Sequence, residues 1–393
     1  MSSFSFSFTF HNQTFFNLSG NQSTDAGSSK KMYYFQRLIG QEPSHLALEC
    51  ALNTKPNYTV LAEEVKANNT KLSDIVKAIA DMVETRAAAG KNYGSVVIPE
   101  GLLESIPECN MLISELDNVF ASGVVKVHAD PADTVRSVRE HLTMWSKSLL
   151  DSMPALVQQQ IMLSRNDNGA VELSQAETEK LLAYFVEIEL DLRKKRGTYK
   201  GTWSCVCSFI GYQARGATPT NFDVTYAYNL GHVAAVLVAN DLSGYMATIN
   251  NLKKSVDRWH PSGVPISAFL QSDPANAVAA ERELHVHSAP LDLASASYKA
   301  FQKIRQQCAL SDLYENPGPI QFSGPVSDTR PTTLTLESFD YLREIRALYK
   351  ALQRITEACR PGCSSMVLQI ATKNLHALTD SLDMIQSAEV SKK

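Results

Sequence analysis

The sequence lacks the features that mark membrane proteins and nucleic-acid-binding proteins. Its 393 residues contain no run of about eighteen apolar residues, so no transmembrane helix is expected. The net charge is −4, the pI is about 6.2, and no long basic run stands out. A nucleic-acid partner is therefore not expected. The composition, 44% hydrophobic and 20% charged, is that of an ordinary globular protein with one large domain or two smaller ones.

The cysteines do not form a disulfide framework. There are seven, an odd number, and no CxxC pair occurs. This pattern favours free thiols in a reducing compartment, which we take to be the cytoplasm. Zinc is the alternative, because Cys359 and Cys363 flank a Pro-Gly turn and His285 and His287 are two apart. Neither pair has a second pair at zinc spacing, so no metal site is expected.

The first 21 residues differ from the rest. Phenylalanines alternate mostly with serine, the first acidic residue is Asp25, and the first basic residue after His11 is Lys30. A transit peptide is Ser-rich and poor in acids, as here, but usually carries arginine. A signal peptide needs a continuous apolar core, which serine interrupts. We expect a poorly ordered tail over residues 1–21, since termini are the usual place of disorder.

From Tyr33 onward the pattern is α/β. Residues 58–61 form a short apolar run typical of a buried strand, and residues 95–98 form another, stopped by Pro99. Between them lies a helical pattern with Ser73 as the expected N-cap. A strand, a helix and a strand at this spacing predict a βαβ unit and a parallel sheet.

The rest of the chain alternates between helical and strand patterns. Residues 120–197 are predicted to be mostly helical, with Ser174 and Glu177 as a capping box. Residues 203–209 alternate as a strand with one packed face. Residues 232–240 are predicted to be a buried helix, and further helices are predicted over about 342–355 and 364–386.

Two turns carry candidate binding residues. In GYQARG (211–216), Tyr212 offers a hydroxyl and Arg215 offers a planar fork of donors suited to phosphate. On spacing alone, an arginine in a turn is more often a solvated loop residue than a phosphate ligand. In IPEGL (98–102), Glu100 follows a strand of the predicted parallel sheet, where ligands bind. Its carboxylate is suited to sugar hydroxyls, or to capping the next helix.

These motifs have a recognisable order. The sequence resembles pyrophosphate–fructose 6-phosphate 1-phosphotransferase over roughly residues 22–393, and its end resembles the alpha (regulatory) subunit type of plants. The segments that carry the resemblance are KMYYFQRLIG (31–40), SHLALECAL (44–52), IPEGLLESIPE (98–108), LSQAETEKLLAY (173–184), GTYKG (197–201), GYQARG (211–216), NLGHVAAVLVANDLSGYMATINNLK (229–253) and DLYENPGPIQFSGP (312–325).

The resemblance implies a sugar-phosphate site. Tyr212 and Arg215 match the family's phosphate-binding pair, and Glu100 matches the glutamate that binds sugar hydroxyls. The family's Met-Gly-Arg motif is here Ile39, Gly40 and Gln41, which loses a positive charge.

A further pair in the family, Lys-Tyr, reaches the neighbouring subunit's site. Here it is Lys31 and Met32, so the tyrosine hydroxyl is lost. A charge-assisted hydrogen bond contributes roughly 1.5–3 kcal/mol, so the loss at position 41 predicts weakened rather than abolished binding.

The donor half of the family's site has no match. The family places a GGDG phosphate cradle and a catalytic aspartate pair upstream of the matched region, and residues 1–30 hold neither. Phosphoryl transfer depends on such a cradle and on Mg²⁺. The resemblance therefore implies no catalytic residue here, with Mg²⁺ and pyrophosphate bound by the missing half or by a partner subunit.

The expected function is that of a regulatory subunit. It would bind fructose 6-phosphate or fructose 2,6-bisphosphate and assemble with a catalytic beta-type subunit in glycolysis. The alternatives are a catalytic subunit whose first half is missing from this sequence, and a non-enzymatic scaffold with a degraded sugar site.

The expected fold is an incomplete phosphofructokinase-like α/β fold. Its predicted parts are the tail (1–21), a sugar-phosphate α/β region (22–119), a helical insertion (120–197) and the remainder with C-terminal helices (198–393).

Overall fold

A computed structural model describes most of the chain up to residue 340. The described residues are 12–40, 44–123, 125, 131–165, 171, 175–214, 218–272, 284–286, 289–324, 327–328, 330–340, 345, 349, 350, 353, 369 and 372. The chain divides into two compact units, Ser3–Glu337 and the remainder, and the fold below is that of the first unit.

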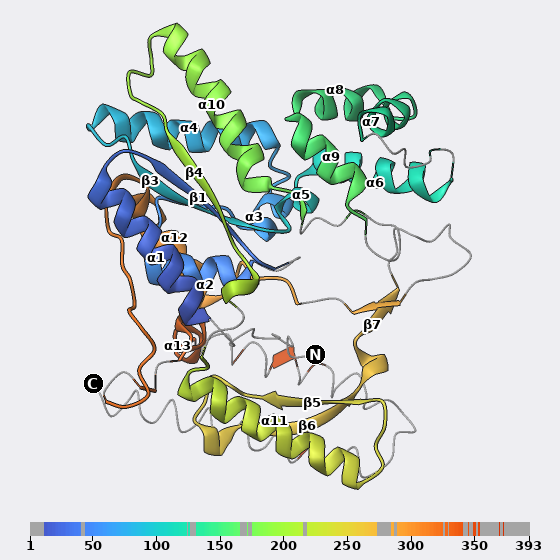
Figure 1. Ribbon diagram of the computed structural model, residues 1–393. Coiled ribbons are helices and arrows are strands. Elements are labelled where there is room, and N and C mark those ends of the chain that lie inside the picture. Colours follow the sequence, from blue (N-terminus) through green and yellow to red (C-terminus); the bar gives the residue numbers. More distant parts are fainter. Residues whose placement is uncertain are drawn as a thin grey trace. The chain divides into compact units, whose positions relative to one another are not determined.

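Helices surround a small number of strands (Figure 1). The helices are α1 (Asn12–Ser29), α2 (His45–Thr54), α3 (Ala62–Ala67), α4 (Leu72–Ala88), α5 (Leu102–Ser105), α6 (Pro107–Ala121), α7 (Pro131–Glu140), α8 (Met144–Ser152), α9 (Ala155–Leu163), α10 (Thr178–Arg196), α11 (Asn221–Ala239), α12 (Ala296–Leu310) and α13 (Thr332–Ser338). The strands are β1 (Tyr33–Leu38), β2 (Tyr58–Thr59), β3 (Gly94–Pro99), β4 (Cys205–Ile210), β5 (Tyr245–Asn250), β6 (His260–Pro265), β7 (Leu270–Ser272) and β8 (Leu284–Val286).

The central sheet is parallel and has four strands in the order β2-β3-β1-β4. The β2–α3–α4–β3 segment is the predicted βαβ unit, and the α/β fold class is confirmed. Two further pairs are antiparallel, β5 with β6 and β7 with β8.

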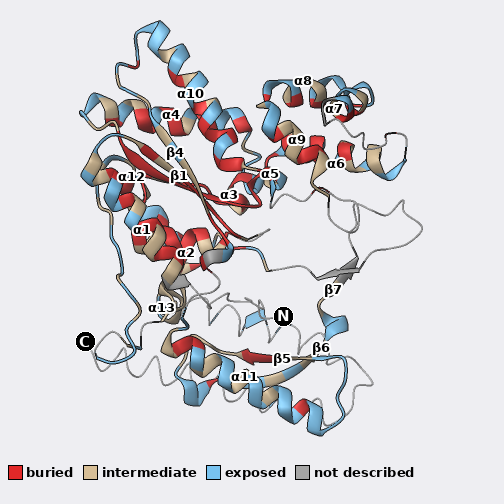
Figure 2. Cartoon of the chain, in the orientation of Figure 1, coloured by how far each residue is buried: buried red, intermediate tan, exposed pale blue. Residues whose placement is uncertain are grey.

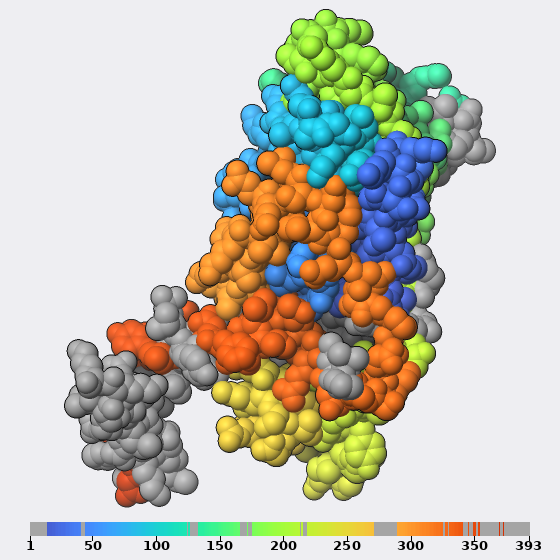
Figure 3. Space-filling view, turned by 90° about the vertical axis from the view of Figure 1, so that its left-hand side faces the viewer, coloured from blue at the N-terminus to red at the C-terminus, as the bar shows by residue number. Residues whose placement is uncertain are grey.

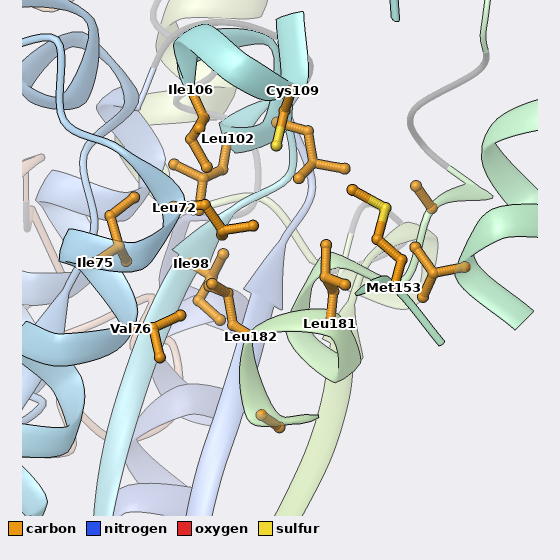
Figure 4. Close-up of a cluster of buried hydrophobic side chains, with 14 of the residues drawn as sticks. Leu72, Ile75, Val76, Ile98, Leu102, Ile106, Cys109, Met153, Leu181 and Leu182 are labelled. Atoms are coloured by element: carbon orange, nitrogen blue, oxygen red, sulfur yellow. The ribbon is translucent and has the colours of Figure 1, made fainter. Parts of the chain in front are cut away.

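Alternating side chains divide the core between the two faces of the sheet. Phe35 and Val96 are paired in register and face a core built from α4, α5, α6 and α10. Figure 4 shows side chains of this core converging from those helices and β3. Val97 faces the second core, where α1, α2 and α12 pack. The central strands β1 and β3 are thus covered on both sides, as in α/β proteins generally, whereas the edge strand β4 is partly exposed.

Helix α1 corrects the expectation of a disordered tail for residues 12–21. Its Phe15 and Phe16 are buried in the second core. On its inner side, the Ser23 hydroxyl donates to Ser95 Oγ at 2.8 Å, and Gln36 Nε2 donates to the same oxygen at 2.9 Å. The helix is rich in Gly, Ser and Asn, which have low helix propensity, so tertiary packing rather than propensity stabilises it. Residues 1–11 lie outside the described residues.

The segment after α12 packs along α1. In Figure 3 the orange segment runs beside the blue helix. Asn316 Nδ2 donates to Asn21 Oδ1 at 2.7 Å, and a Cβ on Gly20 would approach the Glu315 carbonyl oxygen to 3.0 Å. The two glycines of α1 therefore permit a close approach that alanine would not.

Helix starts differ from the predicted caps. Helix α4 has Lys71, not Ser73, at its N-cap, and α10 begins one residue after Glu177, which is itself the N-cap. Ser174 lies outside the described residues. Residues 131–163 and 178–196 are largely helical, as predicted for this stretch, whereas the domain boundaries stay predictions. The helices predicted over 342–355 and 364–386 lie almost wholly outside the described residues.

One prediction about burial is wrong. Residues 232–239 are helical as part of α11, but most of this stretch is exposed. Figure 2 shows long pale blue stretches on α11, whereas β1 and β3 are red. The stretch 233–239 is apolar on every side of the helix, yet β5 and β6 cover only one side.

Candidate functional site

The predicted motifs meet at the carboxyl edge of the central sheet, where β1, β3 and β4 end side by side. Leu38 is in register with Pro99 on β3 and with Ile210 on β4. Beyond the strands, the Ile39 amide donates to the Ile210 carbonyl at 3.1 Å and the Glu100 amide donates to the Leu38 carbonyl at 3.0 Å. Ligands of parallel sheets bind at this edge, so the three motifs delimit one candidate site.

Glu100 is buried at this edge and is 2% exposed. Its Oε2 accepts a 2.7 Å hydrogen bond from the Gly40 amide, and its Oε1 lies 3.6 Å from Arg37 Nη1. Gly40 has a φ of 145°, which a residue with a Cβ rarely adopts. The carboxylate therefore fixes the loop after β1. Capping of the next helix was the alternative role for Glu100. Helix α5 has Gly101 at its N-cap and no side-chain cap, so Glu100 does not have that role.

Arg37 joins two carboxylates from distant parts of the chain. Its Nε lies 2.6 Å from Glu179 Oε2 on α10, and its guanidinium carbon lies 4.0 Å from the centre of the Phe209 ring on β4. Both side chains of the pair are at least 96% buried. Burial raises the pKa of Glu179, against the nearby Arg37 charge. This pair thus links helix α10 to β1, the strand that precedes Gly40.

Sequence reasoning missed Arg37 and Glu179. A signal was present, because Arg37 is a charged residue in an otherwise mostly apolar strand of the parallel sheet. A buried charge in such a strand requires a counter-charge. The partner could not be chosen from the sequence, since Glu179 is far away and its helix carries several other acidic residues.

Tyr212 lies in the 3₁₀ turn Tyr212–Ala214 directly after β4 and is 62% exposed. Behind it Ala214 is buried, and its amide donates to the Gly211 carbonyl at 3.0 Å. The turn therefore places Tyr212 at the surface of the carboxyl edge. Arg215 and Gln41 lie outside the described residues, so their predicted roles stay predictions.

Ile39 and Gly40 occupy different positions. The Ile39 side chain is buried in the second core, so only its backbone is available at the site. Gly40 is half-buried at the edge itself.

Lys31 is not brought to this edge. It precedes β1, at the opposite end of a six-residue strand, which is about 20 Å long. This agrees with the implied role in a neighbouring subunit's site, which stays a prediction.

Glu63 ties two segments together beside the site. Its Oε1 accepts from the Ser44 amide at 3.0 Å and from the Leu291 amide at 2.9 Å. His45 Nε2 lies 3.0 Å from the Ala289 carbonyl oxygen, and the Ser44 hydroxyl accepts from the Ala62 amide at 2.8 Å. The start of α2 and the segment before α12 are thereby fixed to α3.

No metal centre is found among the described residues. They contain no group of three or more His, Cys, Asp or Glu side chains with the geometry to hold an ion. Cys205 and Cys207 are neighbours on one side of β4, with sulfurs 3.9 Å apart, and pack against the first core as the alternation predicted. Cys359, Cys363 and His287 lie outside the described residues. Within the described part of the chain, no helix is both long and apolar enough to cross a bilayer.

No protein-family model matches the chain. It is 40% identical over 379 residues to pyrophosphate–fructose 6-phosphate 1-phosphotransferase subunit alpha 2 of Arabidopsis thaliana, covering 95% of this chain and 60% of that subunit. It is 40% identical over 374 residues to subunit alpha of Solanum tuberosum, covering 94% of this chain and 59% of the relative. Subunit beta 1 of Arabidopsis thaliana is 39% identical over 318 residues, which is 81% of this chain and 54% of that subunit.

The fold and the site define an α/β protein with a candidate ligand site at the carboxyl edge of a parallel sheet. The chain is homologous to one part of the pyrophosphate-dependent phosphofructokinase subunits. The resemblance drawn from the motifs is confirmed, including its extension over nearly the whole chain. The chain spans about 60% of the length of the alpha subunits that it matches.

Proposed function

We propose that this chain is a regulatory, alpha-type subunit of a pyrophosphate-dependent phosphofructokinase, which binds a fructose phosphate without catalysing phosphoryl transfer itself. The observation that carries the proposal is the meeting of the described parts of three motifs, Ile39 and Gly40, Glu100, and residues 211–214, at the ends of three adjacent strands. Cytoplasmic glycolysis is the setting that this function implies.

The alpha type is favoured by the extent of the similarity. Alpha subunits align with 95% and 94% of this chain, whereas the beta 1 subunit aligns with 81% at nearly the same identity. This chain therefore has residues that align with the alpha subunits and do not align with the beta 1 subunit. A catalytic beta-type subunit is therefore the partner that we assign to it.

The site chemistry supports a phosphate ester as the ligand. Exposed Tyr212 offers a hydroxyl at this edge, and Arg215, three residues further along the chain, would add a permanently charged fork of donors. Fructose 6-phosphate and fructose 2,6-bisphosphate are the candidates from the relatives' chemistry and from the resemblance. Binding is expected to be weakened by Gln41, which leaves less positive charge at the site.

The donor side of the reaction is assigned to the partner. The 393 residues contain no GGDG cradle, so Mg²⁺ and pyrophosphate would be bound by another part of the complex. The purified 393-residue chain is expected not to phosphorylate fructose 6-phosphate with pyrophosphate or with ATP. Activity that rises in proportion to this chain in a preparation free of other subunits would overturn that part of the proposal.

Ligand binding separates the regulatory subunit from a scaffold. Fructose 6-phosphate and fructose 2,6-bisphosphate are titrated calorimetrically against the complex with a beta-type subunit mutated to bind neither. Saturable binding is expected, and Gln41→Arg is expected to tighten it roughly 10- to 100-fold, the value of one charge-assisted hydrogen bond. No heat with either sugar phosphate, for the wild type and for Gln41→Arg, would leave the scaffold as the better account.

A further inference from the structure

Arg37 lies beneath the carboxyl edge of the sheet, at the penultimate position of β1, and is 3% exposed. It is in register with Ile98 on β3 and with Phe209 on β4, so it lies between the two other strands that end at the candidate site. Burying a charge costs free energy unless other groups pair with it. The groups that pair with Arg37 lead to separate parts of the site.

The first contact leads to the Gly40 loop, residues 39 and 40. Arg37 Nη1 lies 3.6 Å from Glu100 Oε1, and the other oxygen of the same carboxylate, Oε2, accepts the 2.7 Å hydrogen bond from the Gly40 amide. Glu100 is 2% exposed, so solvent competes little for either oxygen. A rotation of this carboxylate would move it away from the Gly40 amide, and the guanidinium opposes that rotation because it attracts Oε1.

The second contact leads to the described part of the GYQARG turn. The guanidinium carbon of Arg37 lies 4.0 Å from the centre of the Phe209 ring. The same ring lies directly against the turn, because a Cβ on Gly211 would come within 2.2 Å of its Cε1. The Gly211 carbonyl accepts from the Ala214 amide at 3.0 Å and closes the 3₁₀ turn that carries Tyr212. Arg37 therefore supports this turn through Phe209.

The third contact fixes the guanidinium itself. Arg37 Nε lies 2.6 Å from Glu179 Oε2 in the first turn of α10, and Glu179 is 2% exposed. The start of α10 is in turn held to α9, because Gln160 Nε2 donates to Glu177 Oε2 and the Glu177 amide donates to Gln160 Oε1, both at 3.1 Å. A planar guanidinium can contact carboxylates at its edges and a ring with its face, which a lysine ammonium cannot do.

We propose that Arg37 is a positioning residue of the sugar-phosphate site, which sets the Gly40 loop and the GYQARG turn relative to each other, and that Glu179 fixes its orientation. The inference rests on the proposed function, because the loop is assigned to the sugar and the turn to its phosphate. Arg37 contacts no ligand in this role. A displacement of the start of α10 would act through the guanidinium on both segments together, which gives the helical stretch before β4 an influence on the affinity of the site.

Arg86 is the matched control, since it is a buried arginine with the same kinds of contact at the opposite end of the sheet. It is 1% exposed, its Nη2 donates to Asp312 Oδ1 at 2.7 Å, and its guanidinium carbon lies 5.5 Å from the centre of the Tyr93 ring. Tyr93 directly precedes β3, so Arg86 supports the amino end of the strand whose carboxyl end carries Glu100. A general loss of stability would follow from changing either arginine, whereas an effect on the site would follow from Arg37 alone.

The first test needs no ligand. Hydrogen exchange at the Gly40 and Ala214 amides is measured in the full chain by mass spectrometry with electron-transfer fragmentation, for the wild type, Arg37→Lys and Arg86→Lys. In Arg37→Lys both amides are expected to exchange roughly 10-fold faster or more, relative to the amides of β3, because both segments lose their common support. In Arg86→Lys the same ratio should equal that of the wild type. Arg37→Lys keeps a positive charge beside the two carboxylates, so it is expected to fold, which circular dichroism checks.

Glu179→Gln is a second variant, which leaves Arg37 in place and removes the charge that orients it. It is expected to accelerate exchange at the same two amides. The proposal is overturned if Gly40 alone responds, because the loop and the turn would then be independent of each other. It is also overturned if neither amide responds in Arg37→Lys and Glu179→Gln, or if Arg86→Lys has the same effect.

The second test measures the affinity for fructose 6-phosphate, by calorimetric titration of the complex with the beta-type subunit mutated to bind no sugar phosphate. Arg37→Lys is expected to weaken binding roughly 10-fold, because a site without its supporting residue is misplaced, and Arg86→Lys is expected to bind like the wild type. If the wild type and Arg37→Lys bind equally, the positioning role is wrong and the proposed function stands. If the wild type binds no sugar phosphate, the proposed function is wrong, and exchange at Gly40 and Ala214 still decides whether Arg37 positions the two segments.

Discussion

The Gly40 amide donates a 2.7 Å hydrogen bond to the carboxylate of Glu100, sixty residues further along the chain. This bond joins the ends of β1 and β3 and sets the loop that the resemblance assigns to the sugar. The same carboxylate lies near Arg37, which reaches Glu179 on α10. The candidate site is therefore supported by a buried polar network, and its geometry depends on that network.

Glu100→Gln is expected to lower the free energy of unfolding by about 1.5–3 kcal/mol, the range for a hydrogen bond to a charged group. The amide oxygen still accepts from Gly40, but Arg37 loses one of its two carboxylates. Urea denaturation measures the change, with Glu140→Gln on the exposed end of α7 as the control. A Glu100→Gln protein as stable as the control would show that the Arg37 contact contributes nothing.

Glu49 gives a prediction about pH. It is buried on α2, where its Oε1 accepts from the Thr332 amide at 2.5 Å and its Oε2 accepts from the Thr333 amide at 2.8 Å. Burial raises the pKa of Glu49 above its ordinary value of 4.5, against these bonds. The folded chain then holds the proton more tightly than the unfolded chain, so this group's contribution to stability is lost as pH rises through the raised pKa.

Glu49→Gln removes this titration. Relative to the wild type, its free energy of unfolding is expected to increase as pH rises from about 4.5, by at most about 1.4 kcal/mol per pH unit. Denaturation curves collected from about pH 4 to pH 8 measure the difference, and Glu140→Gln should run parallel to the wild type. The opposite result is that the stability of Glu49→Gln relative to the wild type decreases as pH rises. It would mean that the two amide hydrogen bonds to the ionised carboxylate outweigh the cost of burying its charge.

The thiols should differ widely in reactivity. Burial raises the pKa of Cys50 to about 11 and that of Cys109 to about 12. The hydrogen bond with Cys205 lowers the pKa of Cys207 and raises that of Cys205. Because the thiolate is the nucleophile, Cys207 is expected to be alkylated first among the five cysteines that the structure describes.

Mass spectrometry after brief treatment with iodoacetamide at about pH 8 measures the order. Cys50 and Cys109 are expected to react at least roughly 100-fold more slowly than Cys207, and all of them should react similarly in denaturant. Equal labelling of Cys109 and Cys207 in the folded chain would contradict the burial of Cys109 on the inner side of α6.

The sequence was sufficient for three strands of the sheet and for the edge at which Glu100 and Tyr212 lie. Strands β3 and β4 follow from short apolar or alternating runs, and the rule that ligands bind at carboxyl ends places Glu100 and Tyr212 at one edge. The strands can be predicted from short stretches of sequence. The shared edge depends only on the strands being parallel.

The remaining features depend on contacts between distant residues. Helix α1 was missed because Gly20 and Ser23 are poor helix formers. In the fold, Gly20 permits the close approach of Glu315, and Ser23 hydrogen-bonds to Ser95 on the sheet. The partner of Arg37 could not be chosen without the fold. The exposure of Val238 was also missed, because an apolar stretch of sequence indicates burial.

The central claim is that the carboxyl edge binds a fructose phosphate through the GYQARG turn. The most direct measurement is a calorimetric titration of fructose 6-phosphate against wild type, Arg215→Ala and Arg215→Lys. Each is titrated in complex with the beta-type subunit that is mutated to bind no sugar phosphate. Arg215→Ala is expected to weaken binding by about 2–4 kcal/mol, roughly 30- to 1,000-fold, because a phosphate loses its bidentate, permanently charged contact. Arg215→Lys should recover only part of this loss. Equal affinity of the wild type and Arg215→Ala would contradict the account.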